Sequence, residues 1–128
     1  VREEAALDSA LAEADVVVLT VPLTEKTHHL MNAERFTAMR RGAVLVNIAR
    51  GAVVDTRALE QALKQNHLAG AVLDVFEEEP LSPDSPLWDL ENVVMTPHNS
   101  FVGDGVQERL AQMILENIAS DCREREHK

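Results

Sequence analysis

The sequence is poor in several residue types, and each shortage excludes a class of protein. A single cysteine, Cys122, excludes an intramolecular disulfide framework and a cysteine-rich metal site. Lys and Arg number 12 against 22 Asp and Glu, and the net charge of −10 argues against a nucleic-acid partner or an anionic membrane surface. No apolar run approaches the ~20 residues that span a bilayer. We therefore expect a cytoplasmic protein that binds neither nucleic acid nor membrane, and we expect no metal site.

Aromatic residues are also scarce, at 3% of the 128 residues, whereas hydrophobic residues make up 45%. The core must therefore be aliphatic, and a chain of this length suits one domain with a substantial core. The chain begins at Val1 rather than methionine, and its first residues already have helical character, so we expect it to be part of a longer protein. We assign residues 1–122 to the domain and residues 123–128 to a charged tail.

Four short apolar runs predict the strands of a parallel sheet. None alternates cleanly between apolar and polar residues, and continuous β-branched runs are typical of strands buried on both faces. Helical patterns separate the runs, so the chain is predicted to form βαβ units of an α/β fold, with right-handed crossovers that place helices on both faces of the sheet. The predicted strands span residues 15–21, 43–47, 69–74 and 93–96.

Capping residues predict where the helices begin and end. Asn32 is expected to cap a helix over residues 33–39, and Gly42 to stop it. Asp55 is expected to cap a helix that ends near Lys64, where a cation is favoured. The other predicted helices span residues 7–14 and 106–122. By contrast, residues 77–92 are acidic, proline-rich and without periodicity, which indicates a functional loop.

Charged and titratable residues follow the predicted strands. In a parallel α/β sheet, ligands bind beyond the carboxyl ends of the strands. Arg50 follows the second strand, and although an arbitrary arginine is most often part of a surface ion pair, Gly51 allows close backbone approach here. A guanidinium in this place can bind a carboxylate through two parallel hydrogen bonds.

A histidine and a glutamate follow the fourth and third strands. His98 is preceded by the rigid Pro97 and is suited to moving a proton near neutral pH, whereas the other histidines are interpreted as surface or core residues. The run Glu77–Glu79 is acidic and such runs are usually solvated, but Glu79 stands directly before Pro80. A hydrogen bond from His98 to Glu79 would favour the protonated ring. We therefore expect Arg50 to bind the substrate, His98 to carry the proton, and Glu79 to favour the protonated form of His98.

Four linked motifs carry a resemblance to a known family. The sequence resembles the nucleotide-binding domain of the D-isomer-specific 2-hydroxyacid dehydrogenases. The four motifs occur in the same order as in that family, and the resemblance runs from about Leu7 to Leu115. The resemblance implies a Rossmann-like doubly wound parallel sheet and a catalytic trio at Arg50, Glu79 and His98. The matching stretches are residues 15–24 (DVVVLTVPLT), 42–55 (GAVLVNIARGAVVD), 68–80 (LAGAVLDVFEEEP) and 85–98 (SPLWDLENVVMTPH).

The resemblance also implies a cofactor and a reaction. The cofactor is NAD, with NADP left open, and hydride passes between its nicotinamide and a 2-hydroxyacid/2-oxoacid pair. His98 exchanges the proton and Arg50 binds the substrate carboxylate, while homodimers are usual in the family. The residues expected to bind the cofactor are Val21, Pro22, Ile48, Ala49, Arg50, Asp74 and His98.

Two features depart from the family pattern. The dinucleotide-binding glycine motif is absent, because Gly103-Asp104-Gly105 follows the last strand and has Glu108 in place of the third glycine. We therefore expect the first βαβ half of the domain and the substrate domain to lie outside this chain, and the isolated chain to be inactive. Asn99–Val102 replace the small residues that often follow the family histidine, which leaves the choice of 2-oxoacid open.

Two other functions compete with a dehydrogenase. A dinucleotide-sensing binding protein would keep this fold and act through partners, and a hydrolase would use Glu and His, although no nucleophile or metal set accompanies them. Turnover of a 2-oxoacid separates the enzyme from the sensor. Because the strand at residues 15–21 would lack its family neighbour, it is also expected to form an apolar edge that favours self-association.

Overall fold

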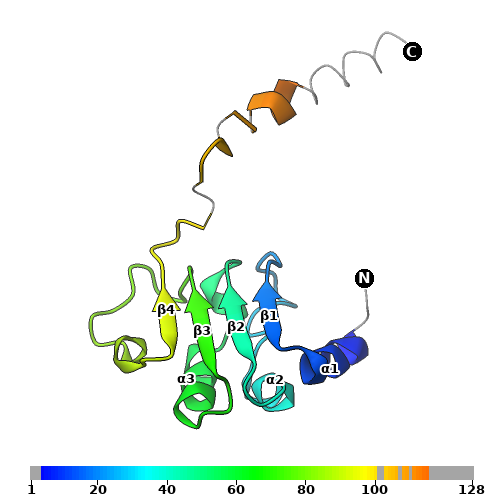
Figure 1. The fold of residues 1–128 in the computed structure, drawn as a ribbon, viewed down its shortest axis with the longest axis vertical. Helices are drawn as coiled ribbons and strands as arrows, with labels where there is room; N and C mark the ends of the chain where they lie inside the picture. The colour runs from blue at the N-terminus through cyan, green and yellow to red at the C-terminus, as the bar shows by residue number, and fades with distance from the viewer. Residues whose placement is uncertain (1–3, 101–102, 107, 110, 116–128) are drawn as a thin grey trace. The chain divides into compact units, whose positions relative to one another are not determined.

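The computed structural model describes residues 4–100, 103–106, 108–109 and 111–115 of the chain (Figure 1). Residue contacts divide the chain into two compact units, residues 1–98 and residues 99–128. The first unit holds the whole sheet and every residue for which the sequence predicts a catalytic or cofactor-binding role.

The first unit is built on a four-stranded parallel sheet, which confirms the predicted α/β class. The strands lie in chain order as β1 (Val16–Leu19), β2 (Val44–Asn47), β3 (Gly70–Leu73) and β4 (Val93–Met95). Each strand is shorter than the apolar run that predicted it. All four arrows point to the same edge of the sheet, so the segments that follow the strands leave it along one rim (Figure 1).

The helices of this unit share one core. Helix α1 (Glu4–Glu13) precedes β1, α2 (Ala33–Ala38) connects β1 to β2, and α3 (Thr56–Lys64) connects β2 to β3. Because neighbouring strands follow one another in the chain, right-handed crossovers place their helices on the same face. The prediction of helices on both faces is wrong for the described residues, since helices change face where the strand order reverses.

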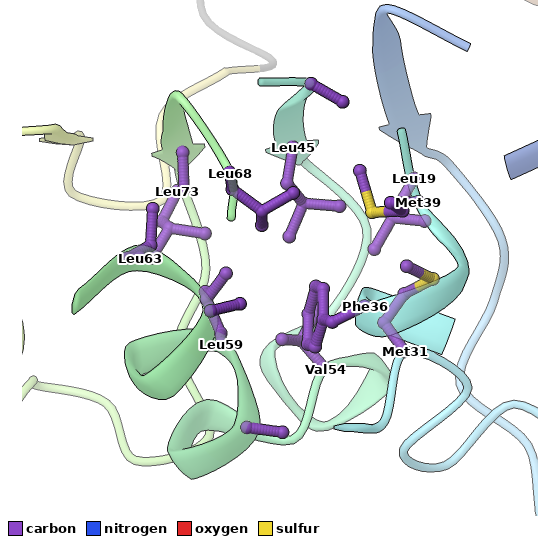
Figure 2. Packing of buried hydrophobic residues seen from close by; sticks show 14 of the residues in the cluster. Leu19, Met31, Phe36, Met39, Leu45, Val54, Leu59, Leu63, Leu68 and Leu73 are labelled. Atoms are coloured by element: carbon purple, nitrogen blue, oxygen red, sulfur yellow. The ribbon is translucent and has the colours of Figure 1, made fainter. Parts of the chain in front are cut away.

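The core lies between this face and the helices. Figure 2 shows Leu45 and Leu73 from the two central strands in one buried cluster with Phe36 of α2 and Leu59 of α3. Leu11 of α1 belongs to the same cluster. The core is almost entirely aliphatic, as the composition predicts, and it fixes the strand ends from which the site residues emerge.

The opposite face of the sheet is open over the described part of the chain. Val16 and Val18 of β1 are 55% and 52% exposed, and Val94 of β4 is 58% exposed. Burial alternates along β2 and β3 between buried and half-buried side chains. The prediction of strands buried on both faces is therefore wrong here, because no described element covers this face. Strand β1 stands at the edge, as predicted.

We expect the 128-residue chain to self-associate through β1, because an apolar edge strand offers unpaired backbone groups to another copy. Sedimentation velocity at roughly tens of micromolar should show dimers or larger species. Val18→Lys should shift the chain toward monomer, whereas Gln61→Lys, which adds the same charge at an exposed position of α3, should not. A clean monomer of the unchanged chain would contradict this prediction.

Local capping determines where the helices begin. The side chain of Asn32 accepts a hydrogen bond from the backbone N–H of Arg35 at 3.0 Å, and that of Asp55 accepts one from Ala58 at 3.1 Å, so both predicted N-caps are confirmed. Gly42 does not end α2, which is capped at Met39. Instead Gly42 has a φ of +84° in the turn that leads into β2, a conformation that suits glycine.

The predicted loop and last helix are only partly as expected. The loop over residues 77–92 contains a short 3₁₀-helix, η2 (Pro86–Asp89), whose first turn is capped by Ser85. In the predicted helix over residues 106–122, the described residues 106, 108–109 and 111–115 are helical, and the others lie outside the described residues, as does the tail 123–128. No helix in the described ranges is long and apolar enough to cross a membrane.

Candidate active site

The residues that follow β2, β3 and β4 form the candidate active site on one rim of the sheet. Arg50 lies three residues beyond the end of β2, Asp74 directly follows β3, and His98 lies three residues beyond β4. Glu79 lies on the loop that leaves β3. The parallel arrangement therefore brings chemically active residues from distant parts of the chain to one edge.

His98 and Glu79 form a hydrogen-bonded pair. Nδ1 of His98 lies 2.8 Å from Oε2 of Glu79, and both side chains are partly exposed. An ionised carboxylate only accepts hydrogen bonds, so Nδ1 carries the proton and donates it. This leaves Nε2 as the ring nitrogen that can exchange a proton with a ligand.

The Glu79 carboxylate has a second partner on its own loop. Its Oε1 accepts a hydrogen bond from the backbone N–H of Phe76 at 2.9 Å. The hydrogen bond from His98, followed by that from Phe76, lowers the pKa of Glu79. Glu79 is therefore ionised at neutral pH and holds the ring of His98 in one orientation.

The lowered pKa of Glu79 predicts an acid-sensitive contribution to stability. The folded state binds the Glu79 proton less readily than the unfolded state does, so the stabilisation is present above the ordinary glutamate pKa of ~4.3 and is lost as the pH falls below it. Urea unfolding between about pH 6 and pH 3 should show a shallower loss of stability for Glu79→Gln than for the unchanged chain. Glu78→Gln, at an exposed neighbour, should keep the original slope; equal slopes for all three would refute the assignment.

His98 is held in an uncommon backbone conformation. Its φ is +53°, in the left-handed region that non-glycine residues seldom occupy, and its backbone N–H donates to the carbonyl oxygen of Thr96 at 3.1 Å. The hydroxyl of Thr96 in turn donates to Oδ1 of Asp74 at 2.5 Å. Asp74 is buried directly after β3, and its hydrogen bond with Thr96 helps to hold the segment that carries His98.

Arg50 is exposed and follows a turn that Asn47 organises. The buried side chain of Asn47 accepts a hydrogen bond from the N–H of Ala49 and donates one to the carbonyl oxygen of Arg50, both at 3.1 Å. One guanidinium nitrogen of Arg50 donates to the carbonyl oxygen of Ala49 at 2.7 Å. Sequence reasoning missed Asn47, although a buried polar residue at the end of an apolar strand was a usable signal.

Gly51 joins the Arg50 turn to the Glu79 loop. A Cβ atom added at Gly51 would lie 1.9 Å from both the carbonyl carbon and the oxygen of Phe76, so only glycine allows this backbone contact. Phe76 is also the residue whose N–H binds Glu79. The two segments are thus packed directly against each other. The sequence predicted that backbone could come close to Gly51, but not that the partner would be Phe76.

The structure places the predicted site residues around two separate cavities. His98 and Glu79 line a cavity of about 390 Å³ together with Trp88 and Met95. Arg50 lines another, of about 430 Å³. Within the described residues, no hydrogen bond or ion pair joins Arg50 to the His98–Glu79 pair. The predicted contact of His98 with Glu79 is present, and Arg50 follows β2 on the same rim.

The second cavity gathers most of the predicted cofactor-binding residues. It lies where the chain leaves β1 and β2, and its volume falls within the range of small-molecule sites. Of the predicted set, Val21, Pro22, Ile48, Ala49 and Arg50 line it, whereas Asp74 and His98 do not. In the parts of the chain described, no three His, Cys, Asp or Glu side chains cluster closely enough to hold a metal ion.

Comparison with known proteins identifies the family. Residues 1–100 match the model of the D-isomer specific 2-hydroxyacid dehydrogenase, NAD binding domain. The chain belongs to this family. The resemblance stated from the motifs is therefore confirmed, and so is the Rossmann-like class of its parallel sheet.

Individual relatives agree with the family assignment. The chain is 50% identical over 112 residues to a glyoxylate reductase of Korarchaeum cryptofilum, covering 88% of this chain and 34% of that protein. It is 46% identical to an (S)-sulfolactate dehydrogenase of Chromohalobacter salexigens, covering 88% of this chain and 36% of that protein. The 2-hydroxyacid dehydrogenase structure from Xanthobacter autotrophicus Py2 in complex with NADPH and MES is 53% identical, with a TM-score of 0.73, over 74% of this chain and 30% of that one. The chain thus spans about a third of the length of the curated relatives it matches.

Proposed function

We propose that the complete protein is an NAD- or NADP-dependent oxidoreductase that interconverts a 2-hydroxyacid and a 2-oxoacid. The observation that carries this proposal is the His98–Glu79 pair, in which the carboxylate fixes one ring nitrogen and leaves the other for proton exchange. Family membership supports the same chemistry, and the exposed cation of Arg50 lies on the same rim.

The cavity beyond β1 and β2 fits part of a dinucleotide. Its lining is mixed, with the apolar side chains of Val21 and Ile48 beside the polar side chain of Thr20, which suits a ligand that carries both apolar and polar groups, as a dinucleotide does. The NADPH in the Xanthobacter relative supports this assignment, and both cofactors remain candidates. When bound, the nicotinamide supplies the hydride in reduction and accepts it in oxidation.

His98 moves the proton in both directions. In reduction, the protonated ring donates from Nε2 to the oxygen that develops negative charge at the substrate carbonyl. In oxidation, the neutral ring accepts the hydroxyl proton at the same nitrogen. Glu79 stays ionised throughout and keeps Nδ1 protonated, so the ring presents Nε2 in a single tautomer.

Arg50 binds the carboxylate of the substrate. Its guanidinium is exposed, and none of the ion pairs among the described residues involves it, so it is available for a bidentate contact. The hydrogen bond from Asn47 holds the backbone carbonyl group of Arg50, and one guanidinium nitrogen donates to the carbonyl oxygen of Ala49. This contact anchors the end of the substrate that does not react and orients the carbonyl carbon.

We propose small 2-oxoacids as substrates, a homodimer as the assembly and the cytoplasm as the location. The names of the relatives support a small acid, because glyoxylate and sulfolactate are both short. The exposed valine side chains of the sheet support burial against further protein. The single cysteine supports a reducing compartment.

Steady-state kinetics on the complete protein tests this function. Glyoxylate, pyruvate and hydroxypyruvate are each assayed with NADH and with NADPH, and at least one pair should turn over. His98→Asn should lower kcat by about 10²–10⁴-fold, because it removes the group that transfers the proton. If the protein binds the cofactor but turns over no 2-oxoacid, the enzyme hypothesis fails and the dinucleotide-sensing binding protein is favoured instead.

A further inference from the structure

A second histidine–glutamate pair lies on the segment that carries Glu79. Nε2 of His29 lies 2.6 Å from Oε1 of Glu77, and the two residues are 48 positions apart in the chain. No sequence pattern distinguishes either residue, since His29 is interpreted as a surface or core histidine and Glu77 as part of a solvated acidic run. Neither residue lines the cavity of the His98–Glu79 pair.

The backbone holds His29 in place from one side. Its φ is +48°, and its N–H donates to the carbonyl oxygen of Ala52 at 2.8 Å. Two residues later, the N–H of Met31 donates to the carbonyl oxygen of Val53 at 3.0 Å. Ala52 and Val53 belong to the short 3₁₀-helix η1 (Gly51–Val53), which begins directly after Arg50. His29 is therefore attached to the segment that carries Arg50.

Glu77 has a second partner at the start of α3. Its Oε2 accepts a hydrogen bond from the backbone N–H of Thr56 at 3.1 Å. Partial burial raises the pKa of Glu77, but the hydrogen bonds from Thr56 and His29 outweigh it and lower the pKa. One ionised carboxylate thus connects three segments: the loop at His29, the first turn of α3 and the loop that leaves β3.

This connection extends to the reacting groups through Phe76. Phe76 directly precedes Glu77, its carbonyl group is packed against Gly51, and its N–H binds the carboxylate of Glu79. Glu79 in turn binds Nδ1 of His98. A shift of the Glu77 backbone would therefore displace the donor that orients Glu79.

We propose that His29 and Glu77 are positioning residues, which hold the segment Phe76–Glu79 against the Arg50 turn so that Glu79 meets His98. An ordinary exposed ion pair contributes little to stability. This one differs because both carboxylate oxygens are used and because its partners are backbone-anchored residues on separate segments. The effect on kcat rests on the proposed function, whereas the effect on the loop does not.

The kinetic test compares four single variants of the complete protein with one control variant. His29→Ala and Glu77→Ala should each lower kcat by about 10- to 100-fold, because displacement of a catalytic group by about 1 Å has effects of this size, while KM for the cofactor stays unchanged. His29→Gln and Glu77→Gln keep a hydrogen-bonding group in the same place and should recover most of kcat. Glu78→Ala, at the exposed neighbour of Glu77, should behave as the unchanged protein.

A second measurement reports on the loop without turnover. The indole N–H of Trp88 donates to the carbonyl oxygen of Ser82 at 3.0 Å, and Trp88 lines the same cavity as Phe76 and Glu79. In protein labelled with 5-fluorotryptophan, the ¹⁹F resonance assigned by Trp88→Phe should move in both alanine variants and return in both glutamine variants. The double alanine variant should be no worse than Glu77→Ala alone, because the contact that His29 makes is already lost when Glu77 is removed.

The outcomes separate this proposal from the proposed function. Alanine variants with unchanged kcat and an unchanged Trp88 resonance would overturn the positioning role, and so would additive losses in the double variant. If the unchanged protein turns over no 2-oxoacid, the proposed function fails, and the Trp88 resonance alone decides the positioning role. If an alanine variant does not fold, the glutamine variants decide: a shifted Trp88 resonance in both would overturn the proposal.

Discussion

Replacing Gly51 with alanine should unfold or severely destabilise the domain, by at least about 3 kcal/mol, at the upper end of the cost of overpacking a core. The new methyl carbon would lie 1.9 Å from two backbone atoms of Phe76. Backbone cannot rotate away as a side chain does, so one of the two segments has to move. Thermal unfolding followed by circular dichroism measures the loss.

Gly103→Ala is the matched control for this change. A Cβ atom there would meet only a methyl group of Val106 at 3.7 Å, an ordinary contact distance, so we expect little change in the unfolding midpoint. If Gly51→Ala folds, its displaced Glu79 loop should also lower kcat in the complete protein. A Gly51→Ala domain that unfolds at the original temperature would show that the close approach of the two backbones is absent.

Removing the side chain of Arg50 should have the second large effect, on catalysis rather than on stability. Arg50→Ala should lower kcat/KM for 2-oxoacids by about 10²–10³-fold, the size typical for loss of one preorganised charged contact. Arg50→Lys should recover only part of this, because an ammonium group cannot make two parallel hydrogen bonds to a carboxylate. Steady-state kinetics on the complete protein provide the measurement.

The control for Arg50 is Arg41→Ala, which removes an exposed guanidinium from the turn before β2. We expect it to keep the original kcat/KM and the original unfolding midpoint. Stability should also be nearly unchanged in Arg50→Ala, since the guanidinium is exposed and donates to the neighbouring carbonyl group of Ala49 without forming an ion pair with any described residue. An Arg50→Ala enzyme of near-normal efficiency would remove the carboxylate-binding role.

Local features of the fold were predictable because their causes are local. The N-caps Asn32 and Asp55 bind backbone groups only three residues away, and each strand follows from a short apolar run. The burial of both sheet faces was not predictable in the same way, because it depends on elements beyond the strands themselves. Gly42 was misplaced for a related reason, since α2 ends at Ala38 before glycine is needed.

The candidate site was predictable where motifs and strand ends agreed. His98 and Glu79 meet as expected, and Arg50 follows β2 at the same rim of the sheet. The pair of His29 with Glu77 was not predictable, because it joins a loop before α2 to a loop after β3. No local pattern distinguishes Glu77 from Glu78, and only the folded chain brings one of them to a histidine.

The chain-ordered sheet also limits the length of any molecule that touches both ends of the site. Adjacent strands are spaced ~4.8 Å apart, so the backbones that lead to Arg50 and His98, on strands two places apart, are separated by about 10 Å. The side chains at either end reach into that interval and shorten what is left. A compound with only a few atoms between its anionic group and its reactive carbon can bridge it, whereas a longer one would have to bend out toward solvent.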